Sequence, residues 1–429
     1  MYFIVLSLLT LIPKILCDCY WNDKTSYGYF GSKTPYDEVR GDIRDVTSIN
    51  GCEPISVWFL MRHGTRHPGQ EDVEVMKNMT SIKQDILRSH AAGQGHLCAQ
   101  DITNLKKWNW KNSMDSSASA LTDEGYQELL ELGTRFHEKF HSLLENLDSC
   151  LLRPSSEQRT KMSAMAFAQG LALDKWTFNV SDPLEKDDVV RPYKHCDKRT
   201  AEVINGPHIQ NQMNRYYATE EFQQMLTNVR KRIGIEHELT PRNVTGLYDV
   251  CRFYRAYTET RRDPWCALLS NDELEIMEYL DDVRHYYRNG YGGGSLNVKL
   301  GELALKDLFE KFQSGKDTKT ITGYFTHDTM LDMVYSALGL FNDYPSVSGF
   351  ERIKTRQWRS SFITPFAANL IAILNRCNST EGETLKVQFL INEEEVHICN
   401  DRACSWEDFH EKFSSYTNSN LEFCDSINL

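Results

Sequence analysis

The chain has 429 residues, of which 41% are hydrophobic and 25% charged, and its formal net charge at pH 7 is −12. The length allows two or three domains or one large α/β unit with an insertion, and the composition is that of a globular protein with its own core. The negative charge argues against nucleic acid or an anionic membrane as the main partner, so an anionic substrate would need a local cluster of Arg and Lys.

The chain begins with a short apolar run. Residues 1–12 read MYFIVLSLLTLI, which is too short to span a bilayer and has the length of a signal-peptide core. We expect a signal peptide over residues 1–17, with cleavage near Cys17, although no positive charge precedes the run. The alternative is a buried N-terminal helix. Because no later apolar stretch reaches membrane-spanning length, we expect no membrane association after cleavage.

Cysteines and glycosylation signals also point to secretion. The twelve cysteines are scattered rather than grouped as paired C-x-x-C metal ligands. Four N-x-S/T sequons predict glycosylation sites, at Asn78, Asn179, Asn243 and Asn378. With the apolar leader, these features indicate an oxidising, glycosylating pathway. The C-terminus reads CDSINL rather than a KDEL-type retention signal, so the sequence predicts a secreted, extracellular protein.

Three segments share one local pattern, in which an apolar run leads into a polar loop and then a helical stretch. The runs lie at residues 55–61, 151–152 and 321–325. Strands followed by helices predict an α/β fold with a mostly parallel central sheet flanked by helices, and sites at the carboxyl ends of the strands. Between them, the pattern predicts a helix over residues 121–140 with Thr122 as its N-cap.

The region from residue 174 to residue 288 reads as helical and polar, which is typical of a helical insertion. We therefore expect an α/β core over about residues 18–75, 118–175 and 285–429. An inserted α-helical cap would occupy about residues 76–117 and 176–284. Near the end, TLKVQFLINEEEVHI predicts a hairpin that turns at Asn392.

The sharpest chemical signal is RHGTRHP at residues 62–68, directly after the apolar run ISVWFLM. A neutral imidazole at His63 is a good nucleophile towards phosphorus, and the forks of Arg62 and Arg66 can bind phosphate oxygens bidentately. Gly64 would let the backbone approach the bound group closely. Nearby guanidinium charges disfavour the imidazolium form of His63. A basic surface turn would explain one Arg but not the whole pattern.

R-H-G-x-R-x-P after a buried strand resembles the histidine phosphatase superfamily, in its acid phosphatase and phytase branch. Its members carry a downstream H-D or H-A-E motif, which His327 and Asp328 match, and a third phosphate-binding Arg, which Arg159 matches in PSSEQRTKM. The family's L-T-x-x-G…L-G-x-R helix is found at residues 121–135. The resemblance implies the histidine phosphatase fold, with His63 as nucleophile and Asp328 as the leaving-group acid. It assigns the transferred phosphoryl group to Arg62, Arg66, Arg159 and His327.

Within that branch, the chain is most similar to the multiple inositol polyphosphate phosphatases. The supporting stretches are YFGSKTPYDEV, DPWC, YLDDVRHYYRNGYG, RSSFITPFAANLIAIL and VQFLINEEEV. Vertebrate-type members typically read H-A-E where this chain has His327, Asp328 and then Thr329. His67 stands where an aromatic residue such as Tyr is common beside the substrate pocket.

The resemblance also implies a set of disulfides. The pairs are Cys52–Cys377, Cys196–Cys424, Cys251–Cys266 and Cys399–Cys404, which leaves Cys19, Cys98 and Cys150 unassigned. Cleavage after Cys17 would leave 12 − 1 = 11 cysteines, so at least one would lack an internal partner.

Motif chemistry and resemblance together predict a secreted phosphomonoesterase that acts through a phosphohistidine and needs no metal or cofactor. The expected partner is a small phosphorylated substrate, an inositol polyphosphate such as phytate, with 2,3-bisphosphoglycerate as a further family substrate. One alternative is a broad-specificity histidine acid phosphatase, because the H-D motif is shared with those enzymes. Another is a secreted binding protein that holds phosphorylated ligands without turnover. The sequence does not indicate the oligomeric state.

Overall fold

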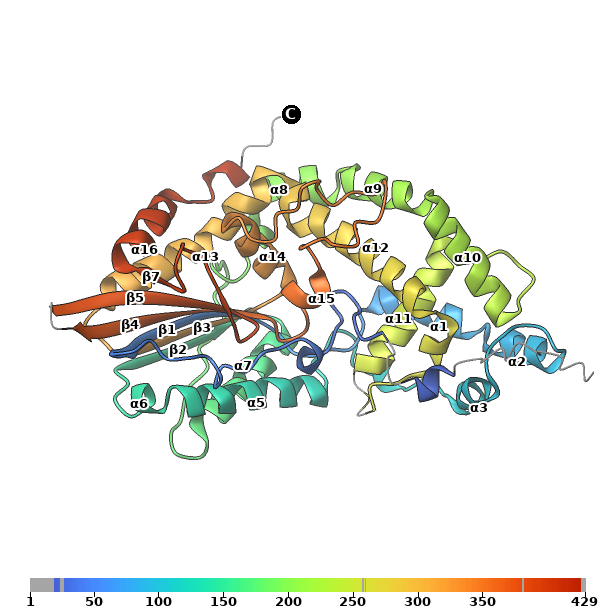
Figure 1. The fold of residues 1–429 in the computed structure, drawn as a ribbon, viewed down its shortest axis with the longest axis horizontal. Coiled ribbons are helices and arrows are strands. Elements are labelled where there is room, and N and C mark those ends of the chain that lie inside the picture. The colour runs from blue at the N-terminus through green and yellow to red at the C-terminus, as the bar shows by residue number, and fades with distance from the viewer. Residues whose placement is uncertain (1–18, 24–26, 257, 259, 380–381, 426–429) are drawn as a thin grey trace, which may run out of the picture.

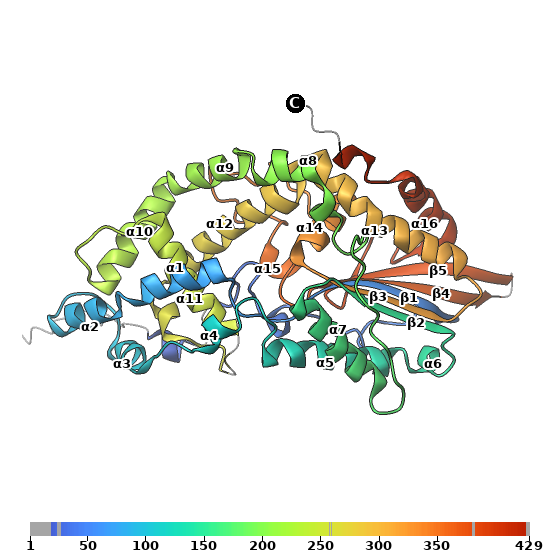
Figure 2. The ribbon, with the colours of Figure 1, turned by 180° about the vertical axis from the view of Figure 1, so that it is seen from behind.

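The computed structural model describes residues 19–23, 27–256, 258, 260–379 and 382–425. A sheet with helices on both faces forms one end of an elongated molecule, and a group of helices forms the other (Figures 1 and 2). The expected signal peptide at residues 1–17 lies outside the described residues. None of the described helices is long and apolar enough to cross a membrane.

Seven strands form one mixed sheet in the order β2-β3-β1-β4-β5-β6, with β7 paired to β5. The strands are β1 (Cys52–Arg62), β2 (Ser149–Pro154), β3 (Thr320–Thr326), β4 (Asn369–Ser379), β5 (Gly382–Ile391), β6 (Glu394–Val396) and β7 (Ala403–Ser405). The α/β class predicted from the sequence is confirmed.

The parallel part of the sheet is smaller than the sequence suggested. Strands β1 and β2 both pair in parallel with β3, whereas β4 pairs antiparallel with β1, and the remaining pairs among β4 to β7 are antiparallel. Two residues, Asn392 and Glu393, separate β5 from β6, and both have positive φ. Connections this short join only antiparallel strands. The predicted hairpin at Asn392 is confirmed, and such hairpins are why the sheet is not mostly parallel.

One set of helices lies beside the strands, and the others extend from the middle of the molecule to its far end (Figure 1). Those beside the sheet are α5 (Asp123–Lys139), α6 (His141–Leu144), α7 (Gln158–Ala172), α13 (Ser295–Ser314), α14 (Asp328–Ala337) and α16 (Trp406–Phe413). The others are α1 (Gln70–Thr80), α2 (Lys83–Ala91), α3 (Ala99–Lys107), α4 (Ser113–Ser116), α8 (Asp197–Arg199), α9 (His208–Tyr217), α10 (Glu220–Ile233), α11 (Pro241–Ala256), α12 (Asn271–Asn289) and α15 (Ser360–Ile363). The limits of core and cap remain a prediction.

Alternating residues of β1 pack on opposite faces of the sheet, as the strand period of two requires. Phe59 contacts Phe136 of α5 and Phe167 of α7, with ring centroids 5.5 and 5.0 Å away. Trp58 points to the other face, where its Nε1 donates to Asp307 of α13 at 2.9 Å. Both β1 side chains are fully buried. The strand that leads into RHGTRHP is therefore clamped between two helical layers.

The four disulfides implied by the resemblance are all present in the structure. A fifth joins Cys19 to Cys98, which the sequence left unassigned. Cys150 is a half-buried free thiol, so the odd cysteine expected from parity lies in β2. Burial raises the pKa of the Cys150 thiol to about 12, so it stays protonated at neutral pH.

The four sequon asparagines differ in their surroundings. Asn78, Asn179 and Asn378 are exposed, whereas Asn243 is half-buried and its side-chain amide donates to the sulfur of Met79 at 3.4 Å. Glycosylation remains a prediction at all four positions.

Candidate active site

Three parallel strands end side by side, and each is followed by residues that the sequence assigned to the site. In the sheet register, Arg62 at the end of β1 pairs with Thr326 of β3, and Pro154 at the end of β2 pairs with Phe325. Because carboxyl ends of parallel strands meet at one sheet edge, the segments after them come together there.

His63 follows β1 directly and is only 2% exposed. Its Nδ1 lies 2.8 Å from the carbonyl oxygen of Gly64. A carbonyl only accepts, so Nδ1 carries the proton and Nε2 keeps its lone pair. Burial, and then the charges of Arg62 and Arg159, hold the pKa of His63 well below its usual range. The imidazole is therefore neutral, as the predicted nucleophile has to be.

Arg62 is 1% exposed and fixed on several sides. One terminal nitrogen donates to the carbonyl oxygens of Ser32 and Thr364, the latter at 2.8 Å. The guanidinium carbon lies 4.6 Å from the ring centroid of Phe366. Its other terminal nitrogen is 3.1 Å from Asp328. The guanidinium group of Arg62 is thus held in a fixed position, with one edge facing Asp328.

Arg66 and Arg159 bring two more cations to the site from different elements. Arg66 donates to the carbonyl of His67 at 2.7 Å, and no described carboxylate forms an ion pair with it. Burial, and then Arg159 and Arg62, lower the pKa of Arg66 to about 10. Arg159, in the first turn of α7, places its Nη2 3.3 Å from Nδ1 of His327. Arg159 also pairs with Glu157 at 3.4 Å, so Arg66 is the cation of this pair that lacks an ion pair with a described acid. Cations held this close with so few acids favour an anionic ligand.

His327 follows β3, and its ring centroid lies 5.5 Å from that of His63. Arg159 can only donate, so Nδ1 of His327 accepts and Nε2 donates to the hydroxyl of Ser155 at 3.2 Å. Burial, and then Arg159 and Arg191, hold the pKa of His327 well below its usual range. A neutral His327 is therefore an uncharged ring beside His63.

Asp328 is the first residue of α14, and its side chain is 20% exposed. Burial acts to raise its pKa, but Arg62, His285 and Lys33 outweigh burial and hold the pKa of Asp328 well below its usual range. One of its oxygens also accepts from the backbone N–H of Thr329 at 2.8 Å. The ligand-free site therefore contains an aspartate, and an acid role requires that a ligand raise its pKa.

The loop after His63 is held by the N-terminal part of α5. Both carboxyl oxygens of Glu128 accept from Thr65, from its N–H at 2.7 Å and from its hydroxyl at 2.8 Å. The Thr65 carbonyl accepts from the backbone N–H and hydroxyl of Thr122, each at 3.0 Å. A Cβ on Gly64 would lie 2.3 Å from the carbonyl of Gly125, so only glycine fits between loop and helix.

The structure thus brings together six residues that the sequence placed in the site, namely Arg62, His63, Arg66, Arg159, His327 and Asp328. His67 is half-buried, and besides burial its pKa responds to Glu124, Asp123 and Lys111 rather than to the arginine cluster. A pocket role for His67 remains a prediction.

Sequence reasoning missed Lys33 and Glu128. Lys33 lies in YFGSKTPYDEV, which supported only the family resemblance, and Glu128 looks like one more polar residue of a helix. The charge of Lys33 acts on the pKa of Asp328, and Glu128 holds residues 63–68, the catalytic loop of the predicted site. No local signal marks either residue, because Asp328 and Thr65, the residues on which they act, are far away in sequence.

One group of possible metal ligands occurs in the described part of the chain, formed by Cys19, Cys98 and Asp101. Its two sulfurs are joined in a disulfide, and Asp101 accepts from the backbone N–H groups of Tyr20 and Trp21. A disulfide offers no thiolate, so we assign no metal to these residues.

The chain was compared with known families, sequences and structures. The model of the histidine phosphatase superfamily (branch 2) matches residues 55–392. Multiple inositol polyphosphate phosphatase 1 of Drosophila melanogaster is 27% identical, over 97% of this chain and 91% of the relative. The phytase from D. castellii superposes with a TM-score of 0.73 at 18% identity, covering 91% of this chain and 86% of that one.

A further similar structure is Bifidobacterium longum multiple inositol polyphosphate phosphatase in complex with inositol hexasulfate. It has a TM-score of 0.70 and 14% identity, and covers 91% of this chain and 98% of that one. These structural similarities support the fold, and the family model covers most of the chain, including most of β1, the catalytic loop, β3 and α14. The chain belongs to the histidine phosphatase superfamily, branch 2.

Proposed function

We propose that the protein is a phosphomonoesterase that removes phosphate from inositol polyphosphates through a phosphohistidine on His63. The observation that carries this proposal is the hydrogen bond from His63 Nδ1 to the Gly64 carbonyl at 2.8 Å. It leaves the Nε2 lone pair available next to Arg62, Arg159 and His327.

In the first step, Nε2 of His63 attacks phosphorus in line with the ester oxygen. The N–P bond forms, the P–O ester bond breaks, and the leaving alcohol takes a proton from Asp328. Arg62, Arg66, Arg159 and neutral His327 stabilise the negative charge on the equatorial oxygens. These residues are positioned before substrate binds, so little reorganisation is needed.

The proton on Asp328 must arrive with the substrate, because the ligand-free carboxyl has a strongly lowered pKa. A bound phosphate competes with Asp328 for Arg62 and adds negative charge, and both effects raise the pKa of Asp328. Below about pH 6 the phosphomonoester itself carries a proton that it can pass on. This account favours activity on the acidic side of neutral.

In the second step, water attacks phosphorus and the N–P bond breaks. Asp328, now ionised, takes a proton from that water, so it is protonated in the product complex as it was in the substrate complex. It releases this proton when phosphate leaves and returns to the ionised form of the ligand-free site. Inorganic phosphate leaves, and neutral His63 is regenerated. The balance is one ester and one water converted to one alcohol and one phosphate.

The names of the relatives support inositol polyphosphates as the substrate class, and so do the cations around the site. Arg191 contributes to the lowered pKa of His327, and the charges of Arg288 and Asp328 interact. A locally positive site in a chain of net charge −12 would draw a polyanion to this edge of the sheet.

The H-D form of the second motif favours one further candidate, a broad-specificity acid phosphatase. In this chain the acid, Asp328, follows His327 directly, whereas the H-A-E form places a Glu one residue later. The two candidates share one mechanism and differ in substrate range.

We also propose that the protein is secreted. The five disulfides of the described chain support an oxidising compartment. Cleavage of residues 1–17 is tested by sequencing the N-terminus of protein collected from the medium. An intact N-terminus, or protein retained in cells, would contradict the proposal.

The function is tested by phosphate release from inositol hexakisphosphate at about pH 5 with EDTA present. A His63→Ala variant should lose release, whereas His90→Ala, on helix α2, should retain it. Release that persists in His63→Ala would overturn the mechanism. Hydrolysis of an aryl phosphate alone would favour the acid phosphatase, and tight binding of inositol hexakisphosphate without any release would favour a binding protein.

A further inference from the structure

A buried lysine beside the active site lacks an acidic partner. Lys33 is 6% exposed, and its ammonium group donates to the hydroxyl of Ser32 at 2.7 Å. None of the described carboxylates lies within ion-pair distance of it. An ammonium has three donors, so two are left for another acceptor.

The surroundings make this charge costly in the ligand-free protein. Burial is the largest effect and, with the charges of Arg252, Arg66 and Arg62, lowers the pKa of Lys33 to about 7, against the opposing effect of Asp281. Asp281 does not neutralise Lys33, because its carboxylate already pairs with Arg252 at 3.2 Å and with Arg284 at 2.9 Å. An anionic ligand stabilises a buried cation without an acidic partner more than it stabilises one that is already paired.

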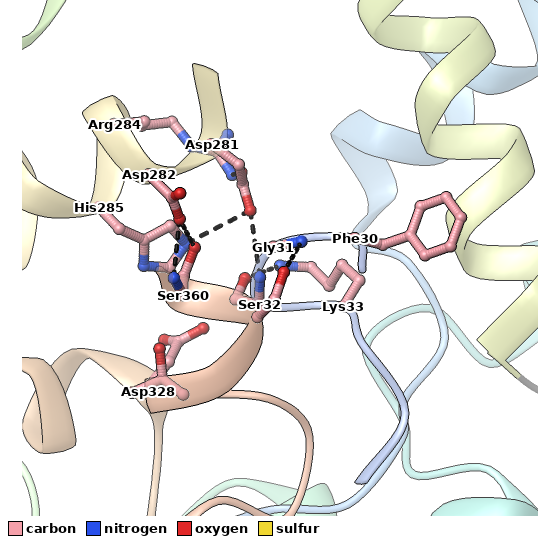
Figure 3. Close-up of polar contacts among 12 residues, drawn as sticks. Phe30, Gly31, Ser32, Lys33, Asp281, Asp282, Arg284, His285, Asp328 and Ser360 are labelled. Atoms are coloured by element: carbon pink, nitrogen blue, oxygen red, sulfur yellow. Dashed lines mark hydrogen bonds and ion pairs between the residues drawn. The ribbon is translucent and has the colours of Figure 1, made fainter. Parts of the chain in front are cut away.

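The backbone fixes Lys33 next to the phosphate site. The carbonyl of Ser32 accepts from Arg62, and the N–H of Ser32 donates to Asp281 at 3.2 Å. A Cβ on Gly31 would lie 2.1 Å from an oxygen of Asp281, so the loop is wedged against α12. Figure 3 shows Ser32 and Lys33 between Asp281 of α12 on one side and Asp328 on the other.

We propose that Lys33 binds a second phosphate group of the substrate, one that is not transferred. This inference rests on the proposed function. Arg62, Arg66 and Arg159 surround His63 and serve the transferred group, whereas Lys33 reaches the site from the N-terminal loop. A lysine binds phosphate as a point charge and does not need fixed bidentate geometry. Lys33 would thus favour substrates with neighbouring phosphates over simple monoesters.

The first test compares kcat/KM for inositol hexakisphosphate and for an aryl phosphate at about pH 5.5, where Lys33 is charged. Lys33→Met removes the charge at similar length, and Lys33→Gln keeps a donor to Ser32. Both should lower the ratio of the two kcat/KM values by about tenfold or more. Since each removes an uncompensated buried charge, neither should lower the unfolding midpoint.

Lys139→Met is the matched control. Lys139 is a partly buried lysine whose pKa burial also lowers, and it donates to a carbonyl, that of Val46. It ends α5, about 17 Å along the helix from Glu128, which binds the loop after His63. This variant has the same net charge as Lys33→Met and should leave the ratio unchanged. A ratio that is unchanged in both Lys33 variants, or that falls as far in Lys139→Met, would overturn the proposal.

The second test uses inositol hexasulfate as a competitive inhibitor of aryl phosphate hydrolysis at about pH 5.5 and about pH 8.5. Sulfate esters keep their charge over this range. Lys33 loses its proton as the pH rises through about 7, so inhibition of the wild-type protein should weaken. Lys33→Met should be inhibited weakly, with less change between the two pH values.

The other charged groups facing Lys33 do not titrate in that range. They are Arg252 and Asp281 from the helices, Arg62 and Arg66 from the catalytic strand and loop, and Asp328. Glu128, with a pKa of about 7, and His285, which pairs with Asp281, are present in both proteins, so any pH dependence that they cause cancels in the difference. If inhibition of the wild-type protein and of Lys33→Met changed with pH in the same way, the role of Lys33 would be overturned. Inhibition by hexasulfate without hydrolysis of inositol hexakisphosphate would instead refute the proposed function and leave the Lys33 test intact.

Discussion

Two loops meet at Arg62, and the chain holds them in different ways. The catalytic loop, residues 63–68, is held by hydrogen bonds from α5 and α7, with Glu128 accepting twice from Thr65 and Ser163 accepting from the N–H of Gly64. The N-terminal loop, residues 30–34, is held against charged groups, with Asp281 at its centre. The hydrogen bonds fix the orientation of the catalytic loop, whereas the ionic contacts balance the charges around the N-terminal loop.

This difference separates geometry from electrostatics in one active site. A nucleophile must be aimed to within a fraction of an ångström, which short hydrogen bonds to a helix achieve. Cations for a polyanion need to be concentrated, which requires buried acids to offset them until ligand arrives. Substitutions in the first region should therefore act mainly on turnover, whereas loss of an acid that offsets the cations of the second region should act mainly on stability.

The largest effect is expected at Asp328, where the two regions meet. Asp328→Asn removes the proton donor, so kcat for inositol hexakisphosphate should fall by about 10³-fold. An aryl phosphate has a better leaving group and should lose much less. Steady-state kinetics on both substrates measure the difference, with Asp123→Asn, an exposed residue of α5, as control. Equal losses would instead assign Asp328 to holding Arg62.

The second-largest effect tests the charged groups that hold the N-terminal loop. Asp281→Asn leaves Arg252 and Arg284 without their shared carboxylate, so the free energy of unfolding at pH 7 should fall by about 3 kcal/mol. Arg252 and Arg284 hold the pKa of Asp281 below its unfolded value, although burial opposes them, so the loss is present above about pH 4 and shrinks in more acidic solution.

Urea unfolding of both proteins measures this loss. The control is Asp85→Asn, which breaks the exposed pair between Asp85 and Arg88 and should cost less than about 0.5 kcal/mol. Equal small losses in the two variants would show that Asp281 does not balance the charge of the N-terminal loop.

The same contrast explains what the sequence could predict. The catalytic loop was readable because Arg62, His63 and Arg66 are neighbours in the chain, and His327 and Asp328 follow a strand with a similar signal. The charged groups around the N-terminal loop could not be predicted, because Lys33 and Asp281 are separated by most of the chain. In the sequence, α12 has only the pattern of a polar helix. Likewise, the antiparallel half of the sheet depends on pairing between β1 and β4, which no local pattern encodes.

The third prediction concerns the hydrogen bonds that hold the catalytic loop. Glu128→Ala frees the N–H and hydroxyl of Thr65, so the loop that carries Arg66 loses its fixed position. The expected fall in kcat is about 10²-fold at about pH 5. Glu128→Gln should keep most activity there, because the amide can accept from the N–H and donate to the hydroxyl. Similar kcat values for both variants and the wild-type protein would show that Glu128 does not position the loop.

The smallest effect separates the charge of Glu128 from its hydrogen bonds. Burial raises the pKa of Glu128 to about 7, despite the opposing hydrogen bonds from Thr65. Between the unfolded value of about 4.3 and 7, only the folded state holds this proton, so stability falls as the pH rises through that window. Glu128 is half-buried, so we expect about 1–2 kcal/mol from this group. Glu128→Gln removes this decline, and its free energy of unfolding should rise relative to wild type from about pH 4.5 to about pH 7.5. Parallel urea-unfolding results at the two pH values would mean that Glu128 is ionised when it holds Thr65, and the catalytic loop would then rest on a charge as the N-terminal loop does.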